Sequence, residues 1–173
     1  MKKAVLIIAC RNFQDWEYSA TKEVLEDEGI KIKTASDQKG IAIGKNGLEI
    51  KIDLSIEEIK LRDFEAVIFI GGGGALEHLD NEISYNLIKE TIKQNKILAA
   101  ICVSPVILAK AGILKNKKAT VWWSSLDKKP LKILEENSVE FVDKNVVSDG
   151  KIITANGPAA AKEFGESILK VIR

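Results

Sequence analysis

Short apolar runs alternate with amphipathic stretches along most of the chain. The apolar runs are rich in β-branched residues and span residues 4–9, 30–35, 66–70 and 97–101. The stretches between them carry apolar residues at helical spacing, for example Trp16, Ala20 and Val24 after the first run. Continuous apolar strands separated by helices are typical of a parallel sheet that is covered on both faces. The pattern therefore predicts a doubly wound α/β fold.

One segment interrupts this alternation. Residues 41–44 and 48–53 flank the sequence Lys45-Asn46-Gly47. An Asn-Gly pair between alternating apolar and polar residues is a strong hairpin signal. We therefore expect a β-hairpin that projects from the sheet.

Shorter elements are predicted for the rest of the chain. Gly112 follows an apolar helical stretch, as expected of a residue that ends a helix. We expect helices over residues 103–111, 126–137 and 159–172, a short strand over 118–121, and edge strands over 139–142, 146–148 and 152–154. The chain contains no repeat, low-complexity segment or linker, so we expect one domain over residues 1–173.

Composition and charge narrow the class of protein. Of the 173 residues, 46% are apolar and 29% are charged, which is the balance of an ordinary globular protein. The net charge is +1 and the acids and bases are interleaved, so the chain lacks the basic surface that nucleic acids or anionic membranes require. We expect no nucleic-acid partner and no membrane partner, which leaves small molecules and proteins.

The N-terminal apolar run ends at Arg11-Asn12 without a small-residue cleavage site. It is interpreted as a buried strand rather than a signal peptide, and we expect a cytoplasmic protein. Two cysteines, Cys10 and Cys102, end separate apolar runs. In this setting a structural disulfide is not expected, and both thiols should be reduced.

Cys102 lies where a predicted strand runs directly into a predicted helix, whose first turn contains Pro105. A nucleophile elbow is built in this way, with a tight bend that presents a side chain at the carboxyl edge of a sheet. A helix N-terminus lowers the pKa of a thiol, so we expect an available thiolate at Cys102. The alternative is a small apolar cysteine in the core, and the spacing alone does not decide between the two.

Two further features follow neighbouring strands. The four glycines at residues 71–74 could turn backbone amides toward a substrate as an oxyanion hole, or form a flexible turn. The Lys and Ser or Thr of a phosphate loop do not follow them. Glu17, after the first strand, could exchange a proton with a thiol if burial raises its pKa. Otherwise it is an acid in the first turn of a helix, with Asp15 as the N-cap.

His78 is the only histidine, and no second histidine or paired cysteine stands at a ligand spacing from it. We therefore expect neither a metal nor a cofactor. Trp122 and Trp123 follow a predicted strand, where they either wall a pocket near Cys102 or pack in a core or an interface.

Together and in this order, these features resemble the PfpI-like superfamily. That group includes PfpI-type intracellular proteases, a parkinsonism-associated deglycase, and chaperone and glyoxalase relatives. The resemblance covers essentially the whole chain and implies a three-layer α/β/α fold with a mostly parallel sheet, of the flavodoxin-like and class I glutamine amidotransferase-like type. It rests on Glu17, on the segments 67–72, 100–105, 108–114 and 153–158, and on Glu163-Phe164.

The resemblance also implies roles for individual residues. Cys102 would be the nucleophile and Glu17 its hydrogen-bonded carboxyl partner. The N–H groups of Gly72 and Val103 would be the oxyanion donors. The family's proteases have a histidine directly after the nucleophile, where this chain has Val103. The deglycase branch has a histidine in the next strand, where this chain has Trp122.

Three functions are weighed on this basis. The first is a reaction on a small carbonyl compound such as a 2-oxoaldehyde, in which Cys102 adds to the carbonyl and Glu17 moves the proton. The second is a redox-responsive or chaperone-like protein that binds a protein client after oxidation of Cys102, without turnover. A cysteine peptidase is supported least, because only Glu77 and His78 could replace the missing base. The resemblance, together with the apolar and aromatic residues around the hairpin and the Trp122-Trp123 segment, further predicts a homodimer or a higher homo-oligomer.

Overall fold

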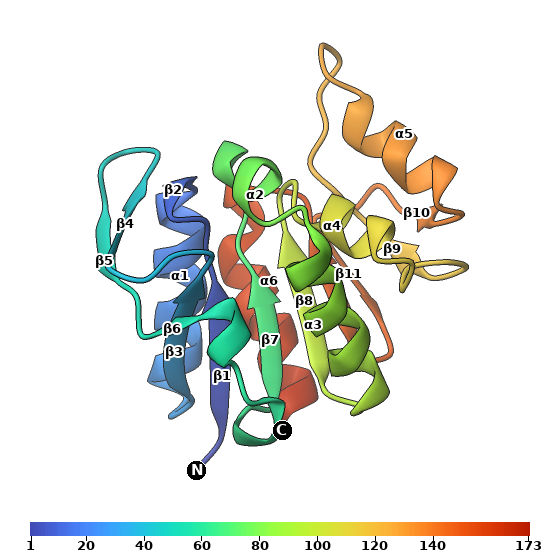
Figure 1. Cartoon of the computed structure of the whole chain (residues 1–173). Coiled ribbons are helices and arrows are strands. Elements are labelled where there is room, and N and C mark those ends of the chain that lie inside the picture. The colour runs from blue at the N-terminus through green and yellow to red at the C-terminus, as the bar shows by residue number, and fades with distance from the viewer.

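A seven-stranded sheet forms the centre of the computed structural model, which describes residues 1–173 (Figure 1). Its strands are β1 (Lys3–Ile7), β3 (Lys31–Ser36), β6 (Leu54–Ser55), β7 (Ala66–Phe69), β8 (Ile97–Ile101), β11 (Val146–Asp149) and β12 (Ile152–Ala155). The strand order is β11-β12-β8-β7-β1-β3-β6, and all neighbouring strands are parallel except β11 and β12. The predicted fold class, an α/β protein with a mostly parallel sheet, is confirmed.

Helices cover both faces of this sheet (Figure 1). They are α1 (Asp15–Asp27), α2 (Gly73–His78), α3 (Glu82–Lys93), α4 (Pro105–Lys110), α5 (Lys129–Glu136) and α6 (Ala161–Ile172), with short 3-10 helices η1 (Ile56–Glu58), η2 (Leu61–Asp63) and η3 (Pro158–Ala160). Helices α1 and α6 pack together on one face, and α3 and α4 lie on the other. The result is a three-layer α/β/α arrangement.

Alternate residues of each strand supply two separate cores. In β1, Ala4 and Leu6 belong to the core beneath α1 and α6, and Val5 and Ile7 belong to the core beneath α3 and α4. Successive side chains of a strand point to opposite faces of the sheet, so a strand covered on both faces buries every position. This explains the continuous apolar runs of the sequence.

The predicted hairpin is present, as part of a second, smaller sheet. Strands β4 (Ile41–Gly44) and β5 (Glu49–Lys51) pair antiparallel, and β4 also pairs with β2 (Arg11–Phe13). Gly47 takes a φ of 93° in the turn, a conformation that favours glycine. The hairpin is therefore tied to the segment between β1 and α1.

Two of the predicted edge strands are placed differently. Strand β12 is interior, because it pairs with β8 on one side and with β11 on the other. Strand β10 (Glu140–Phe141) lies outside the main sheet and pairs only with β9 (Lys118–Ala119). The spacing of apolar residues shows which side chains are buried, but it does not identify the partner of a strand.

The carboxyl ends of β1, β7 and β8 meet at one edge of the sheet, because these strands are parallel neighbours. This is the upper edge in Figure 1, and both chain termini lie at the lower end. Ligand sites of open α/β sheets form at the carboxyl edge, so the segments that follow these strands are the place to look for function. None of the helices has the length and hydrophobicity needed to cross a bilayer.

Candidate active site

Cys102 directly follows β8 in a strained backbone conformation. Its φ is 66°, in the left-handed region that residues other than glycine rarely adopt. Its N–H donates to the carbonyl of Ala155 at 2.9 Å, and its carbonyl accepts from the Trp122 N–H at 2.8 Å. Ser104 adds a third constraint, because its Oγ donates to the carbonyl of Ile70 at 2.8 Å. The strand-to-helix turn is thus held by segments on both sides of β8.

Glu17 lies in the first turn of α1 with its side chain fully buried. One carboxyl oxygen, Oε1, accepts a hydrogen bond from the Gly71 N–H at 3.0 Å, and the other, Oε2, is buried without a hydrogen-bond partner. Burial raises the pKa of Glu17 to about 7, and hydrogen bonds from the Gly71 N–H and the Cys102 thiol oppose this rise only in part. A group with this pKa can accept or donate a proton near neutral pH.

Other residues start α1, so the Glu17 carboxyl is not needed for that purpose. The N-cap is Gln14, whose side-chain oxygen accepts from the Glu17 N–H at 2.8 Å. Asp15, expected as the N-cap, instead accepts from the N–H groups of Asn46 and Leu48 in the hairpin turn, at 3.1 and 3.0 Å. The choice of Asp15 was wrong because its hairpin partner comes from a segment that is distant in the sequence.

Burial also raises the pKa of the Cys102 thiol. Burial first, and then the negative charge of Glu17, raise the pKa of Cys102 to about 12. Hydrogen bonds from the backbone N–H groups of Gly72 and Val103 lower this pKa in part. The expectation of an available thiolate is therefore wrong for the unliganded protein, because the cost of a buried charge outweighs the effect of the helix terminus. Reaction at the sulfur requires a group that takes its proton, and Glu17 is the neighbouring carboxylate.

Gly71 and Gly72 let the loop after β7 approach this turn closely. A Cβ on Gly71 would lie 2.3 Å from the Cβ of Cys102, and Gly72 has a φ of 104°. The N–H of Gly71 donates to Oε1 of Glu17, and the N–H of Gly72 lies near the sulfur of Cys102, whose pKa it lowers. The structure therefore brings together Cys102, Glu17 and the N–H groups of Gly72 and Val103.

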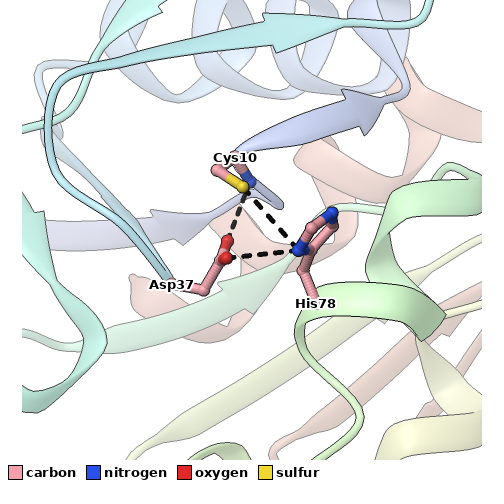
Figure 2. Close-up of side chains that lie close together, drawn as sticks. All are labelled: Cys10, Asp37 and His78. Carbon is pink, nitrogen blue, oxygen red and sulfur yellow. Dashed lines mark hydrogen bonds and ion pairs between the residues drawn. The ribbon is translucent and has the colours of Figure 1, made fainter.

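The other predicted residues have different surroundings. Trp122 is half-buried beside the turn, where its backbone N–H donates to the Cys102 carbonyl. Glu77 is at the surface, with 71% of its side chain exposed. The Nδ1 atom of His78 faces Cys10 and Asp37 instead of Cys102 (Figure 2). Within one chain, His78 therefore does not replace the base that Cys102 lacks.

The cluster of Cys10, Asp37 and His78 was missed from the sequence (Figure 2). Cys10 follows β1, Asp37 follows β3, and His78 ends α2, the helix after β7. These three strands are neighbours, so residues beyond their carboxyl ends converge. The only signal was a ligand-type residue in the segment that follows each strand, and a search for ligands at close spacing in the sequence does not detect such a signal.

Three comparisons relate the chain to known proteins. The model of the DJ-1/PfpI family matches residues 2–171. An uncharacterized protein of Methanocaldococcus jannaschii is 37% identical over 171 residues, which cover 98% of this chain and 82% of that protein. The deglycase PfpI of Pyrococcus furiosus is 28% identical over 169 residues, which cover 98% of this chain and 99% of that protein. The crystal structure of a ThiJ/PfpI domain protein from Brachyspira murdochii is 33% identical with a TM-score of 0.91, over 98% of this chain and 95% of that one. The chain therefore belongs to the DJ-1/PfpI family.

Proposed function

We propose that the protein converts small 2-oxoaldehydes, with Cys102 adding to the aldehyde carbon and Glu17 moving the proton. The observation that carries the proposal is a fully buried carboxyl with a pKa of about 7 that interacts with the thiol of Cys102, which lies on a strained turn. Burial of an ionisable group costs stability, and groups with shifted pKa values cluster at functional sites. Family members named as deglycases, such as PfpI of Pyrococcus furiosus, support an activity of this kind.

The first step follows from the two pKa values. Above about pH 7 Glu17 is a carboxylate and Cys102 is still a thiol. As the sulfur attacks the aldehyde carbon, Glu17 accepts the thiol proton and the aldehyde oxygen gains the negative charge. The N–H groups of Gly72 and Val103, which lie at the sulfur, can donate to that oxygen. Glu17 then returns the proton to the oxygen, which gives a hemithioacetal.

The remaining steps need no oxidant and no reductant. The hemithioacetal carbon carries a hydrogen that the adjacent carbonyl makes acidic. Glu17 can remove it as a proton and deliver a proton to the neighbouring carbon. The hydroxyl proton of the hemithioacetal moves to the neighbouring oxygen, and the product is the thioester of a 2-hydroxy acid. Water cleaves this thioester and releases the 2-hydroxy acid and the Cys102 thiol. The net reaction adds one water molecule to the 2-oxoaldehyde.

The test is consumption of methylglyoxal by the purified protein. Cys102→Ser and Glu17→Gln should each reduce turnover by about 100-fold or more, the usual contribution of a nucleophile or a general base. The control is Glu23→Gln, the same substitution at an exposed position of the same helix, and it should leave turnover unchanged. A wild type without turnover, or full turnover in Glu17→Gln, would refute the proposal.

Alkylation of the thiol tests whether Glu17 acts as a base. The pKa of Cys102 is about 12, so at about pH 8 the sulfur reacts as a thiol whose proton Glu17 accepts. We expect iodoacetamide to modify Cys102 several-fold more slowly in Glu17→Gln than in wild type, in step with the loss of turnover. Alkylation of Cys102 that is unchanged or faster in Glu17→Gln would contradict the role of Glu17 as the base.

A second candidate is a redox-responsive protein without turnover. The observation in its favour is the pair of N–H groups from Gly72 and Val103 at the sulfur, which could hold the oxygens of a sulfinate. Peroxide should then add two oxygens to Cys102 in preference to Cys10, as read by mass spectrometry. Peroxide sensitivity without methylglyoxal consumption would favour this function over the first.

A further inference from the structure

A second group of side chains lies at the same edge of the sheet, beyond β1 and β3 (Figure 2). The sulfur of Cys10 is 3.7 Å from Nδ1 of His78, and Oδ2 of Asp37 is 3.4 Å from the same nitrogen. One ligand atom from each residue lies within 4.8 Å of the other two. We propose that Cys10, Asp37 and His78 bind a zinc ion, with one coordination position open to solvent.

The separations of these atoms fit a tetrahedral zinc ion. Zinc binds thiolate sulfur at about 2.3 Å, imidazole nitrogen at about 2.0–2.1 Å and carboxylate oxygen at about 2.0–2.2 Å. At tetrahedral angles, bonds of these lengths place sulfur and nitrogen about 3.5 Å apart, and nitrogen and oxygen about 3.4 Å apart. The two separations from Nδ1 are 3.7 and 3.4 Å, within a few tenths of an ångström of these values, and the sulfur and carboxylate ligand atoms lie within 4.8 Å of each other.

The same geometry argues against a catalytic triad of Cys10, His78 and Asp37. In such a triad the carboxylate binds one ring nitrogen of the histidine and the nucleophile binds the other. Here the sulfur and the carboxylate both face Nδ1. His78 therefore cannot carry a proton between them through its two nitrogens. Three ligand atoms that converge on one point are what a metal ion requires.

Neighbouring groups orient the proposed ligands. Oδ1 of Asp37 accepts hydrogen bonds from the Cys10 N–H at 2.8 Å and from the Ser36 hydroxyl at 3.0 Å. These bonds leave Oδ2 free to face Nδ1 of His78. On the far side of the ring, Nε2 of His78 lies 4.0 Å from a carboxyl oxygen of the exposed Glu77, which is beyond hydrogen-bond distance. Metal sites commonly have a hydrogen-bonded carboxylate ligand, as Asp37 would be here.

Burial and ligand type identify the metal class and the open position. Cys10 is buried, and the side chains of Asp37 and His78 remain 16% and 29% exposed, so solvent can reach the point where the ligands converge. Thiolate and imidazole ligands favour zinc and its neighbours over magnesium or calcium. Three protein ligands and one solvent position are typical of zinc sites that bind water or a small ligand.

The test is titration of the purified full-length chain with Zn²⁺ and with Co²⁺, which reports its ligands by absorption. We expect one ion per chain, a thiolate-to-cobalt charge-transfer band, and its loss in Cys10→Ser. His78→Gln and Asp37→Asn should each weaken Zn²⁺ binding by more than about 100-fold, because loss of an outer-shell partner alone costs about 10- to 100-fold. Ser36→Ala, which removes such a partner, should fall within that smaller range.

Cys102→Ser distinguishes the two thiols of the chain. The charge-transfer band and the Zn²⁺ affinity should both persist in this variant, because the sulfur of Cys102 belongs to the candidate active site and not to the proposed zinc site. Circular dichroism reports whether each variant is folded. If Cys10→Ser does not fold, His78→Gln and Asp37→Asn, which retain Cys10, still test the proposal. A band that disappears in Cys102→Ser and persists in Cys10→Ser would overturn the proposal, as would the absence of stoichiometric binding. Neither result depends on methylglyoxal turnover.

Discussion

At the scale of single residues, burial sets the protonation of Glu17 and Cys102. Both groups lose hydration, which raises both pKa values, but the carboxyl is the stronger acid and ionises at about 7, against about 12 for the thiol. Between these values the pair holds one proton, and that proton is on the sulfur. Its transfer to the carboxylate during attack leaves the total charge of the pair unchanged, so the site need not stabilise a free buried thiolate.

The raised pKa of Glu17 predicts how stability depends on pH. Its folded pKa of about 7 exceeds its ordinary value of 4.5, so between these values the native state holds a proton that the unfolded chain releases. The stability contributed by this proton is present below pH 4.5 and is lost as the pH rises through 7, by about 3 kcal/mol in total. Because Glu17→Gln cannot titrate, its free energy of unfolding relative to wild type should rise by this amount over the same range.

Urea unfolding at a series of pH values measures this difference. Glu23→Gln serves as the control, because the same substitution at an exposed position should give a nearly constant difference from wild type. A constant difference for Glu17→Gln as well would mean that the carboxyl does not titrate near neutrality.

Cleavage of a peptide needs a proton donor that addition to an aldehyde does not need. Expulsion of an amine from a tetrahedral intermediate needs a proton donor, commonly a histidine. Val103 and Trp122 stand at the two positions where the family resemblance leads one to expect it. We expect casein and fluorogenic peptides to be cleaved only at background, because loss of such a donor costs about 10²- to 10⁴-fold. Robust cleavage that is abolished by Cys102→Ala would show that another group supplies the proton.

At the scale of elements, the sequence predicted what burial alone determines. Residues 97–101 were predicted as a strand and form β8 with the same bounds, because a strand buried on both faces is apolar throughout. Helix α2 was not predicted, because it begins at two glycines, which disfavour a helix interior. At Gly74 the backbone of a neighbouring segment comes too close for a side chain. That approach is a property of the packed molecule and leaves no periodic signal.

The same glycines provide a matched pair of substitutions. A Cβ on Gly74 would lie 1.9 Å from the carbonyl oxygen of Arg11, a backbone atom. A Cβ on Gly73 would meet only the end of the flexible Asn12 side chain, at 2.9 Å. We expect Gly74→Ala to lower the free energy of unfolding by about 2–3 kcal/mol. Gly73→Ala should change it by less than about 1 kcal/mol, because alanine also favours the helix. Equal effects of the two in urea unfolding would contradict this account.

At the scale of the whole molecule, strand order explains which site could be predicted. The residues around Cys102 each stood in a recognisable pattern, a strand-to-helix turn or a glycine run, and the family resemblance joined them. The second cluster, Cys10, Asp37 and His78, forms only because β3, β1 and β7 are neighbours in the sheet. The spacing of apolar residues does not determine this strand order. The direction of the Cys102 pKa shift was also out of reach, because it depends on how completely the layers exclude water.

Apolar residues near the hairpin bear on the prediction of a homodimer. Ile41 on β4 and Leu76 on α2 are 51% and 36% exposed. Strand β2 pairs with β4 and packs against α2, so both residues lie on adjoining elements. Burial of such side chains against a second copy would be favourable, and a two-fold symmetric dimer is the commonest assembly of soluble proteins. Light scattering coupled to size exclusion should therefore give twice the 19.0 kDa mass of the chain.

Charged substitutions locate the interface. Ile41→Glu would bury a carboxylate in the proposed contact, so it should shift the protein toward the monomer at micromolar concentration. Leu126→Glu is the control: this residue is 97% exposed in the loop before α5, on the opposite side of the molecule from the hairpin (Figure 1). A wild-type monomer would contradict the prediction of a dimer. Dissociation by Leu126→Glu but not by Ile41→Glu would keep the dimer and move its interface to the α5 side.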